Sequence, residues 1–322
     1  MSMLYRYKYR FIDKNGNTAL PGLYDGAGSF SEGLAPVKMH DRWGYIDRNG
    51  DVVIECHFVA AGPFSDGLAV ATMGKQGRYG FKYGYIDHCG KFVIDEKYYP
   101  PVDFHEGLAL VSQSELYGFI DQTGKMVIPE KFWGVGMNDE INGFGEGLAR
   151  VASGSRSARK FGYMDKSGAI VIEPRFDNAG RFSEGLARVE IDGKLSFIDK
   201  TGKVVISTGL NLDADFERNS GDFSQGLGGV SESLNTTVTD GNYVFVDRTG
   251  KIVLRTDLFY AYPFSEGLAL GFGASTNKWG YVDKTGKMAI PAIYDSAESF
   301  SEGLAAVGQS EDKKPTRKAP PK

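Results

Sequence analysis

The chain lacks most of the features that mark the special classes of protein. Only two cysteines occur in 322 residues, so a disulfide framework does not hold the fold together. No apolar run approaches the roughly 18 residues that a membrane span requires, and residues 1–16 contain no apolar core of a secretory signal. We therefore expect a cytoplasmic protein without membrane insertion. The formal net charge of −4 gives no reason to expect nucleic acid as a partner.

Glycine, in contrast, is abundant. The chain has 43 glycines, whereas an average usage near 7% would give about 23. An excess of glycine at fixed offsets indicates turns that need a positive φ angle. Hydrophobic residues make up 41% and aromatic residues 13% of the chain, as in an ordinary globular protein. Tight turns are therefore expected at many places in a globular fold.

A six-residue motif recurs eight times. The sequence FSEGLA begins at Phe30 and returns letter for letter at three later places, and four variants such as FSDGLA complete the set. Consecutive motifs begin 34 to 41 residues apart, which is the spacing of a tandem repeat. The hexamers begin at Phe30, Phe64, Phe104, Phe144, Phe182, Phe223, Phe264 and Phe300.

A second motif, aromatic–Gly–Tyr–Ile–Asp–x–x–Gly, alternates with the hexamer. In residues 279–290, WGYVDKTGKMAI, an apolar stretch meets Asp-x-x-Gly and a second apolar stretch, which predicts a β-hairpin. We expect Asp283 to cap the turn and Gly286 to take the left-handed position. The hexamer then starts another strand, as in residues 185–191, where apolar residues alternate. The hairpin aspartates are Asp13, Asp47, Asp87, Asp121, Asp165, Asp199, Asp247 and Asp283.

These motifs resemble the WG-repeat family, also called KWG repeats, which is named for the pair seen here as Trp43–Gly44 and Trp279–Gly280. The resemblance covers about residues 5–308. Two units, at Leu195–Ser196 and Tyr243–Val244, lose the pair, so we expect them to be distorted. The resemblance implies a β-rich tandem repeat, mostly bacterial, that generally serves binding and has no family-wide active site.

The order of the motifs predicts how the array ends. The chain enters with a hairpin that lacks a preceding hexamer strand and leaves with a hexamer strand that lacks a following hairpin, so together they complete one unit. We predict an all-β fold of eight tandem antiparallel units over residues 1–308, closed into a β-propeller-like ring. An open β-superhelix, or solenoid, is the alternative. Segments such as 175–182 would supply a fourth, outer strand, and residues 309–322 a disordered basic tail.

The acidic position of the hexamer is the first candidate for chemistry. In a ring these side chains would gather on one face as an acidic rim that attracts a basic partner or a cation. The structural alternative is that they accept hydrogen bonds from turn N–H groups, and turn chemistry likewise explains the hairpin aspartates. The rim positions are Glu32, Asp66, Glu106, Glu146, Glu184, Gln225, Glu266 and Glu302.

Departures from the repeat are the second candidate, because structure already explains the consensus. Aromatic residues and arginines are the usual anchors of interfaces, and several lie in or near the irregular segments. The irregular segments span residues 72–82, 132–144, 153–160, 208–222 and 231–242. The candidate binding residues are Trp133, Arg150, Arg156, Arg159, Lys160 and Arg188.

The sequence gives no pattern for catalysis, a metal or a cofactor. All four histidines and both cysteines fall between residues 40 and 105, but without the spacing of a metal motif. We therefore expect a non-catalytic scaffold that binds another protein through its inserted loops. The alternative is a module that binds carbohydrate or a cell-envelope polymer, and an enzyme with its site at the ring centre is a third hypothesis.

Overall fold

The computed structural model describes residues 7–99, 101–114, 116–133, 143–154, 159–211, 222–231 and 243–311. Within these ranges the chain forms strands β1 to β30 and no helix, so the all-β prediction is confirmed. No helix in the described part of the chain could cross a membrane.

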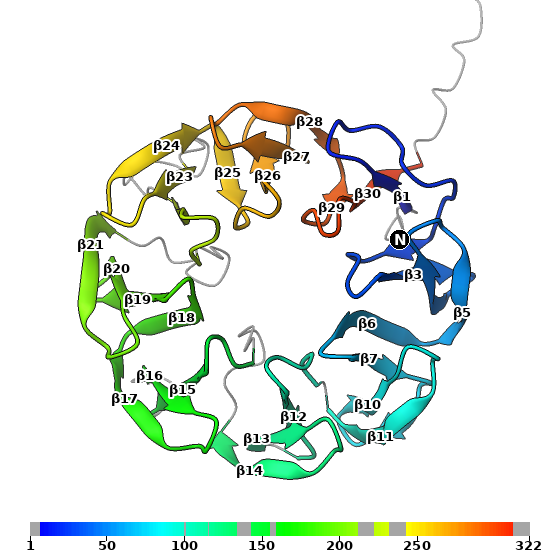
Figure 1. Cartoon of the computed structure of the whole chain (residues 1–322), viewed down its shortest axis with the longest axis horizontal. Coiled ribbons are helices and arrows are strands. Elements are labelled where there is room, and N and C mark those ends of the chain that lie inside the picture. Colours follow the sequence, from blue (N-terminus) through cyan, green and yellow to red (C-terminus); the bar gives the residue numbers. More distant parts are fainter. Residues whose placement is uncertain are drawn as a thin grey trace, which may run out of the picture.

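The strands form eight small antiparallel sheets, one for each repeat unit, and a separate two-stranded sheet in unit two. The eight sheets follow one another around a circle (Figure 1). A complete unit has four strands, which we call inner, second, third and outer from the centre of the circle outward. In the first unit these are β2 (Gly26–Ala27), β3 (Leu34–Met39), β4 (Arg42–Asp47) and β5 (Val52–Phe58).

The next six units repeat this order, although units three, four and six show only the last three strands among the described residues. Unit two consists of β6 (Ala60–Ser65), β7 (Leu68–Thr72), β10 (Tyr83–Ile86) and β11 (Phe92–Tyr98), with the short pair β8 (Gln76–Gly77) and β9 (Gly80–Phe81). Unit three has β12 (Leu108–Ser112), β13 (Leu116–Asp121) and β14 (Met126–Trp133); unit four has β15 (Leu148–Ser153), β16 (Lys160–Asp165) and β17 (Ile170–Phe176). Unit five has β18 (Asn178–Ser183), β19 (Leu186–Ile191), β20 (Lys194–Ile198) and β21 (Val204–Asn211); unit six has β22 (Gly228–Ser231), β23 (Tyr243–Val246) and β24 (Ile252–Thr256). Unit seven has β25 (Leu258–Ala261), β26 (Leu268–Gly273), β27 (Lys278–Asp283) and β28 (Met288–Tyr294).

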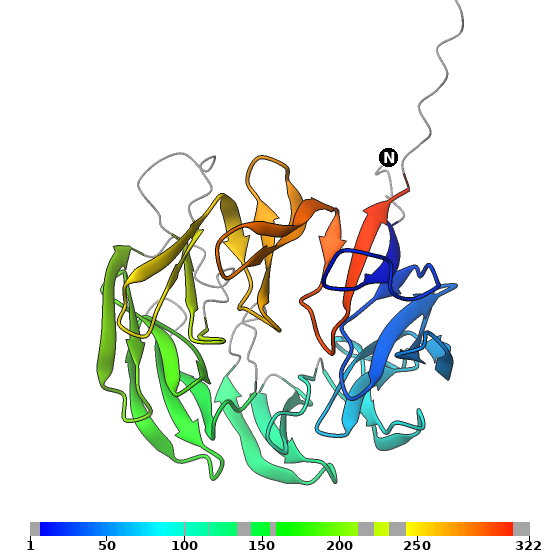
Figure 2. The same ribbon diagram turned by 45° about the horizontal axis from the view of Figure 1, so that its top comes forward.

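The eighth unit combines strands from both ends of the array. β1 (Tyr7–Ile12) pairs antiparallel with β30 (Ala305–Ser310), which pairs in turn with β29 (Ser296–Ala297). Figure 2 shows β1 and β30 side by side. The two partial units therefore pair as the sequence predicts, and β30 runs two residues beyond the expected end of the array at residue 308.

One strand assignment from the sequence is wrong. Residues 178–183 form β18, which is an inner strand and not the expected outer one. The outer strand is instead the second half of each hairpin, as in β17 and β21. In units one to seven the described strands therefore run from inner to outer in the order of the sequence.

The core lies between the units. All eight hexamer phenylalanines are at most 2% exposed. Each ring packs against an aromatic ring of the preceding unit's third strand, with centroids 4.7–5.0 Å apart. Aromatic pairs in such tilted geometries stabilise a protein by about 0.5–1.5 kcal/mol beyond the burial of their area. The pairs are Phe11–Phe30, Tyr45–Phe64, Tyr85–Phe104, Phe119–Phe144, Tyr163–Phe182, Phe197–Phe223, Phe245–Phe264 and Tyr281–Phe300.

The register gives the circle of sheets two different faces. Leu34, just after the hexamer glycine, pairs with the hairpin residue Asp47, so the hexamer and hairpin turns lie at the same end of each sheet. We call this end the hexamer face. The connections from second to third strand, and from outer strand to the next unit, lie at the opposite end, the insertion face. All five irregular segments join strands there, as the pairs Ser153–Lys160 and Leu116–Trp133 show.

Candidate functional site

The residue at the acidic position of every hexamer, which is Gln225 in unit six and Asp or Glu elsewhere, has an unusual backbone conformation. Its φ angle lies between 52° and 55° in all eight units, in the left-handed region that few residues other than glycine adopt. The glycine that follows also has a positive φ. This turn joins the inner to the second strand, and it directs the acidic side chain toward the neighbouring unit instead of back into its own turn.

Each of these side chains accepts a hydrogen bond from the next unit around the circle. The donor is always the backbone N–H of the next hexamer's glycine, at 2.7–3.2 Å. The last bond joins the eighth unit to the first. The pairs are Glu32–Gly67, Asp66–Gly107, Glu106–Gly147, Glu146–Gly185, Glu184–Gly226, Gln225–Gly267, Glu266–Gly303 and Glu302–Gly33.

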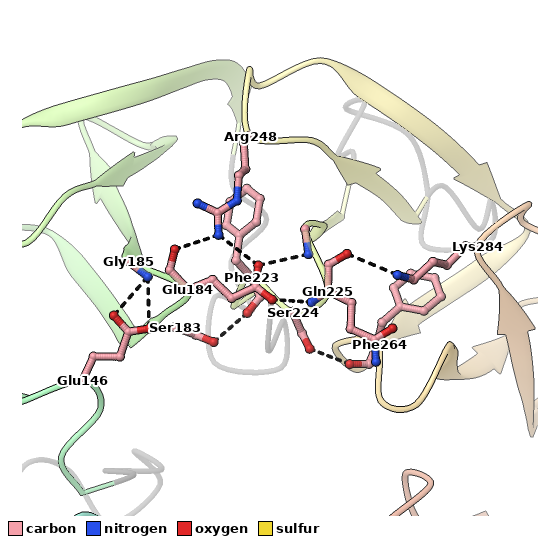
Figure 3. Close-up of polar contacts among 11 residues, drawn as sticks. Glu146, Ser183, Glu184, Gly185, Phe223, Ser224, Gln225, Arg248, Phe264 and Lys284 are labelled. Atoms are coloured by element: carbon pink, nitrogen blue, oxygen red, sulfur yellow. Dashed lines mark hydrogen bonds and ion pairs between the residues drawn. The ribbon is translucent and has the colours of Figure 1, made fainter.

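A second donor from the next unit completes each junction. This donor is the residue that follows the hairpin aspartate of the next unit. Its side chain contacts either the side chain or the backbone carbonyl of the residue at the acidic position. Figure 3 shows two such junctions, in which Arg248 contacts Glu184 and Lys284 contacts Gln225. The other donors are Lys14, Arg48, His88, Gln122, Lys166 and Lys200.

We call this circle of eight junctions the belt. Its serines add a bond in four places, where the hydroxyl donates to the carbonyl of the next hexamer's phenylalanine, as Ser183 does to Phe223 (Figure 3). Two hexamers have another residue in place of this serine, His105 and Gly145. Next to Gly145, Arg181 fills the space and donates to the carbonyl of Phe144 at 2.7 Å. A side chain at residue 145 would clash with Arg181, since its Cβ would lie 2.6 Å away.

The belt accounts for the acidic rim. Partial burial acts to raise the pKa of Glu146, but the bonds from Lys200 and the Gly185 N–H outweigh it, and the pKa is lowered. The pKa values of Glu106 and Glu266 are lowered in the same way. Contacts between units therefore satisfy the hydrogen-bonding capacity of these carboxylates. The sequence suggested that each side chain accepts bonds from N–H groups of its own turn, but the N–H groups belong to the turn of the neighbouring unit.

Comparison with protein families identifies the repeat. The family model described as "WG containing repeat" matches seven stretches that together span more than half of the chain. The chain belongs to the WG-repeat family. The matched stretches are residues 9–43, 43–76, 83–117, 117–132, 161–194, 245–270 and 279–311. No curated protein matches the chain.

Solved structures share the fold of these WG repeats at very low sequence identity. A crystal structure of a eukaryotic initiation factor has a TM-score of 0.51 and 12% identity, and the alignment covers 92% of this chain and 87% of that one. Hsv2 of Kluyveromyces lactis has a TM-score of 0.51 and 8% identity, with 80% and 93% covered. These similarities concern the fold alone.

Lys160, a candidate binding residue, occupies a recurring structural position of the WG repeat. It pairs with Asp177, which also accepts a hydrogen bond from the Asp192 backbone N–H. The same clamp forms in two other units, at Lys8–Asp25 and Lys278–Asp295. In each case lysine and aspartate are 17 residues apart and belong to adjacent units. The charge of Lys160 is therefore already used to join two WG-repeat units.

Arg150 and Arg188 lie between units and not on an open surface. Arg188 is only 5% exposed. Burial lowers its pKa, and the carboxylate of Asp222 in the next unit acts against that shift. Arg150 donates from Nη1 to the Ala179 carbonyl at 2.6 Å and lies over the Phe161 ring. Arg188, a candidate binding residue, is therefore not exposed at the surface.

The remaining candidates are only partly described. Arg156 lies outside the described residues. Arg159 is half-buried at the start of the segment that leads to β16, and Trp133 ends β14, where its backbone pairs with Leu116. No group of three histidine, cysteine or acidic side chains in the described ranges could hold a metal ion.

Sequence reasoning missed an aromatic cluster in unit seven. Tyr260, Phe272 and Trp279 stand opposite one another on three neighbouring strands, and Tyr262 packs on Trp279 with ring centroids 5.8 Å apart. Aligning the units would have revealed it, because the positions of Tyr260 and Tyr262 hold no aromatic residue in the other WG repeats where they are described. Gly26 and Val102 are examples.

Proposed function

We propose that the eight WG-repeat sheets close into a β-propeller ring. Three observations support this: β1 pairs with β30, Glu302 bonds Gly33 across the same junction, and the sheets follow a circle in Figure 1. An open superhelix would need protection for two exposed strand edges, which are prone to aggregation. The ring avoids that need because the first and last strands pair with each other.

On this frame, we infer that the protein is a non-catalytic scaffold that binds another protein through its insertion face. The observation that carries the proposal is the uneven placement of sequence variation. The hexamer face repeats the same junction eight times. All five irregular segments leave from the other face, and binding residues are concentrated in loops that a rigid framework positions.

The test compares the full-length protein in three forms, each carrying an affinity tag in its native host. The first is the wild type, and the second carries Trp133→Ala, Arg156→Ala and Arg159→Ala in the irregular segments. The third is a control with Lys125→Ala and Lys287→Ala, which removes two positive charges from exposed hairpins of the hexamer face. Quantitative mass spectrometry identifies the bound proteins, and titration of the purified partner gives the Kd.

We expect one protein to bind the wild type and the control equally. The insertion-face variant should bind it at least about tenfold more weakly, because a tryptophan and two arginines at an interface commonly contribute more than about 1 kcal/mol each. Equal binding of all three forms would contradict the proposal. Binding of a purified glycan that survives the three substitutions would favour the carbohydrate alternative.

A further inference from the structure

The aromatic cluster of unit seven forms a surface at the insertion face. We call Tyr260, Tyr262, Phe272 and Trp279 the aromatic surface. The rings of Tyr260 and Phe272 are stacked, with centroids 5.4 Å apart and planes 10° apart, and both meet Trp279 edge-on at 5.2 Å. Tyr262 remains 40% exposed. Four aromatic rings are therefore gathered on one sheet, with Tyr262 exposed and the other three partly exposed.

The WG repeat does not require these rings. In unit one, Gly26 and Gly28 stand at the positions of Tyr260 and Tyr262, and Lys38 stands at the position of Phe272. Only the tryptophan, Trp43, is shared. Unit one nevertheless forms the same four strands and the same belt junctions. Three added aromatic residues on one sheet therefore indicate a contact that the repeat itself does not make.

The chain itself leads to this surface. β30 ends at Ser310, whose backbone N–H donates to Asp295 at 2.9 Å. Asp295 forms an ion pair with Lys278, which is the residue before Trp279. Tyr294, the residue before Asp295, is the cross-strand partner of Trp279. Figure 1 shows β27 and β28 beside β29 and β30. The described chain ends one residue later, at Glu311, so it leaves β30 on the side of unit eight that faces unit seven.

The chemistry of residues 312–322 matches that surface. The sequence DKKPTRKAPPK contains three prolines and five lysines or arginines. Proline-rich segments adopt an extended conformation with little loss of entropy and dock on aromatic side chains. Lysine and arginine add cation–π contacts with tyrosine and tryptophan. Eleven residues in that conformation reach roughly 34 Å, which is ample to cross one sheet.

We propose that residues 312–322 pack in cis on the aromatic surface of unit seven. The occupant is this chain's own segment, because β30 ends at Ser310, which bonds Asp295, the partner of the residue before Trp279. A segment tethered there cannot diffuse away. Such tethering raises the effective concentration of a weak ligand to about the millimolar range. The contact is independent of the proposed protein partner, and either proposal can fail without the other.

The experiment uses full-length protein labelled with 5-fluorotryptophan. Its three tryptophans, Trp43, Trp133 and Trp279, give separate fluorine resonances, which Trp→Phe variants assign. The wild type is compared with a variant in which residues 312–322 are replaced by a glycine–serine segment of equal length. Trp43 is the matched control, because it occupies the same repeat position in unit one. A synthetic peptide with the sequence of 312–322 is then titrated into the glycine–serine variant.

We expect the replacement to shift the Trp279 resonance by more than its linewidth and to leave the Trp43 resonance in place. The added peptide should return the Trp279 resonance toward its wild-type position. Tyr262→Ala should weaken that titration about fivefold, as the loss of one cation–π or stacking contact predicts. Tyr79 lies on the same face but in another unit and serves as the control. Tyr79→Ala should leave the affinity for the added peptide unchanged.

Three outcomes would overturn the proposal. An unchanged Trp279 resonance would show that the segment does not touch the surface. Equal shifts at Trp43 and Trp279 would show a general change in the ring. A shift that disappears on dilution of the wild type would mean that the segment of a second copy binds, and not the chain's own.

Discussion

At the scale of single residues, the belt places a side chain in a strained backbone conformation, and the hydrogen bonds of the belt offset the energetic cost of that conformation. A side chain with a Cβ in the left-handed region costs roughly 1 kcal/mol relative to an ordinary conformation. Glu184 adopts this conformation and in return accepts bonds from the N–H groups of Gln225 and Gly226 and an ion pair from Arg248. The neighbouring unit thus helps to stabilise this turn.

Glu184→Ala should therefore lower the free energy of unfolding by about 1–2 kcal/mol. The substitution leaves two N–H groups without their acceptor and removes a partly exposed ion pair. Urea denaturation followed by circular dichroism measures the change. Glu173→Ala is the matched control, because Glu173 is exposed on an outer strand, and it should alter stability by less than about 0.5 kcal/mol. Equal effects of the two substitutions would contradict a structural role for the belt.

A buried carboxyl gives the second prediction at this scale. Burial raises the pKa of Asp103 to about 6, from an ordinary 3.8. The folded protein therefore holds this proton more tightly than the unfolded chain does. The favourable contribution is complete below about pH 4 and is lost as the pH rises through 6.

Asp103→Asn keeps a neutral side chain at every pH, so the variant should become more stable relative to wild type as the pH rises from 4 to 7. The gain is at most about 3 kcal/mol. Urea midpoints at pH 4, 5, 6 and 7 provide the measurement. Asp95→Asn, at an exposed position of β11, is the control for the change in charge. A difference from wild type that stays constant with pH would refute the assignment.

At the scale of the strand, the glycine of the Trp–Gly pair is explained by a bulge in the outer strand. The pairing of β16 with β17 shifts register between Phe161 and Tyr163. A Cβ on Gly162 would then lie 2.3 Å from the carbonyl oxygen of Ile172. In unit six, where Val244 replaces the glycine, β23 and β24 pair without a shift at this point. The loss of the pair thus changes the local register, as the sequence suggested for this unit.

Gly162→Ala should accordingly cost about 2–3 kcal/mol, or prevent folding, because the backbone of β17 cannot move away without breaking its bonds. Thermal unfolding measures the loss. Ser196→Ala changes the same repeat position in unit five, where a side chain is already accommodated, and should cost less than about 1 kcal/mol. A Gly162→Ala variant as stable as wild type would show that the bulge is not rigid.

The sequence predicts local structure well and contacts between units poorly. The hairpin turns behave as expected: Asp283 accepts hydrogen bonds from the N–H groups two and four residues ahead, and Gly286 has a φ of 83°. Their chemistry involves only neighbouring residues. The partner of Glu146 could not be predicted, because the register between two units is not encoded in either one. Lys160 looked like a surface charge, although its 17-residue spacing from Asp177 recurs in other units and would have revealed the clamp.

At the scale of the whole molecule, the closed belt predicts that the units unfold together. An open array loses its end units first, because each end has one neighbour only. In the proposed ring each unit has two neighbours, and β1 supplies the pairing partner of β30.

Deleting residues 1–25 should therefore destabilise the entire protein and not only the eighth unit. We expect a lower Tm and self-association through the exposed edge of β30, measured by calorimetry and by light scattering after gel filtration. Deletion of residues 312–322 leaves β30 intact and is the control. A deletion of residues 1–25 that remains monomeric, with an unchanged Tm, would exclude the ring.

The bond between Glu302 and Gly33 joins residues 269 positions apart in the chain. During synthesis on the ribosome, the other seven junctions can form in order as each unit emerges, since each needs only the unit made just after it. The eighth must wait for the final strand. A nascent chain would thus carry an unpaired first hairpin until β30 has been made, and during that interval it would depend most on chaperones.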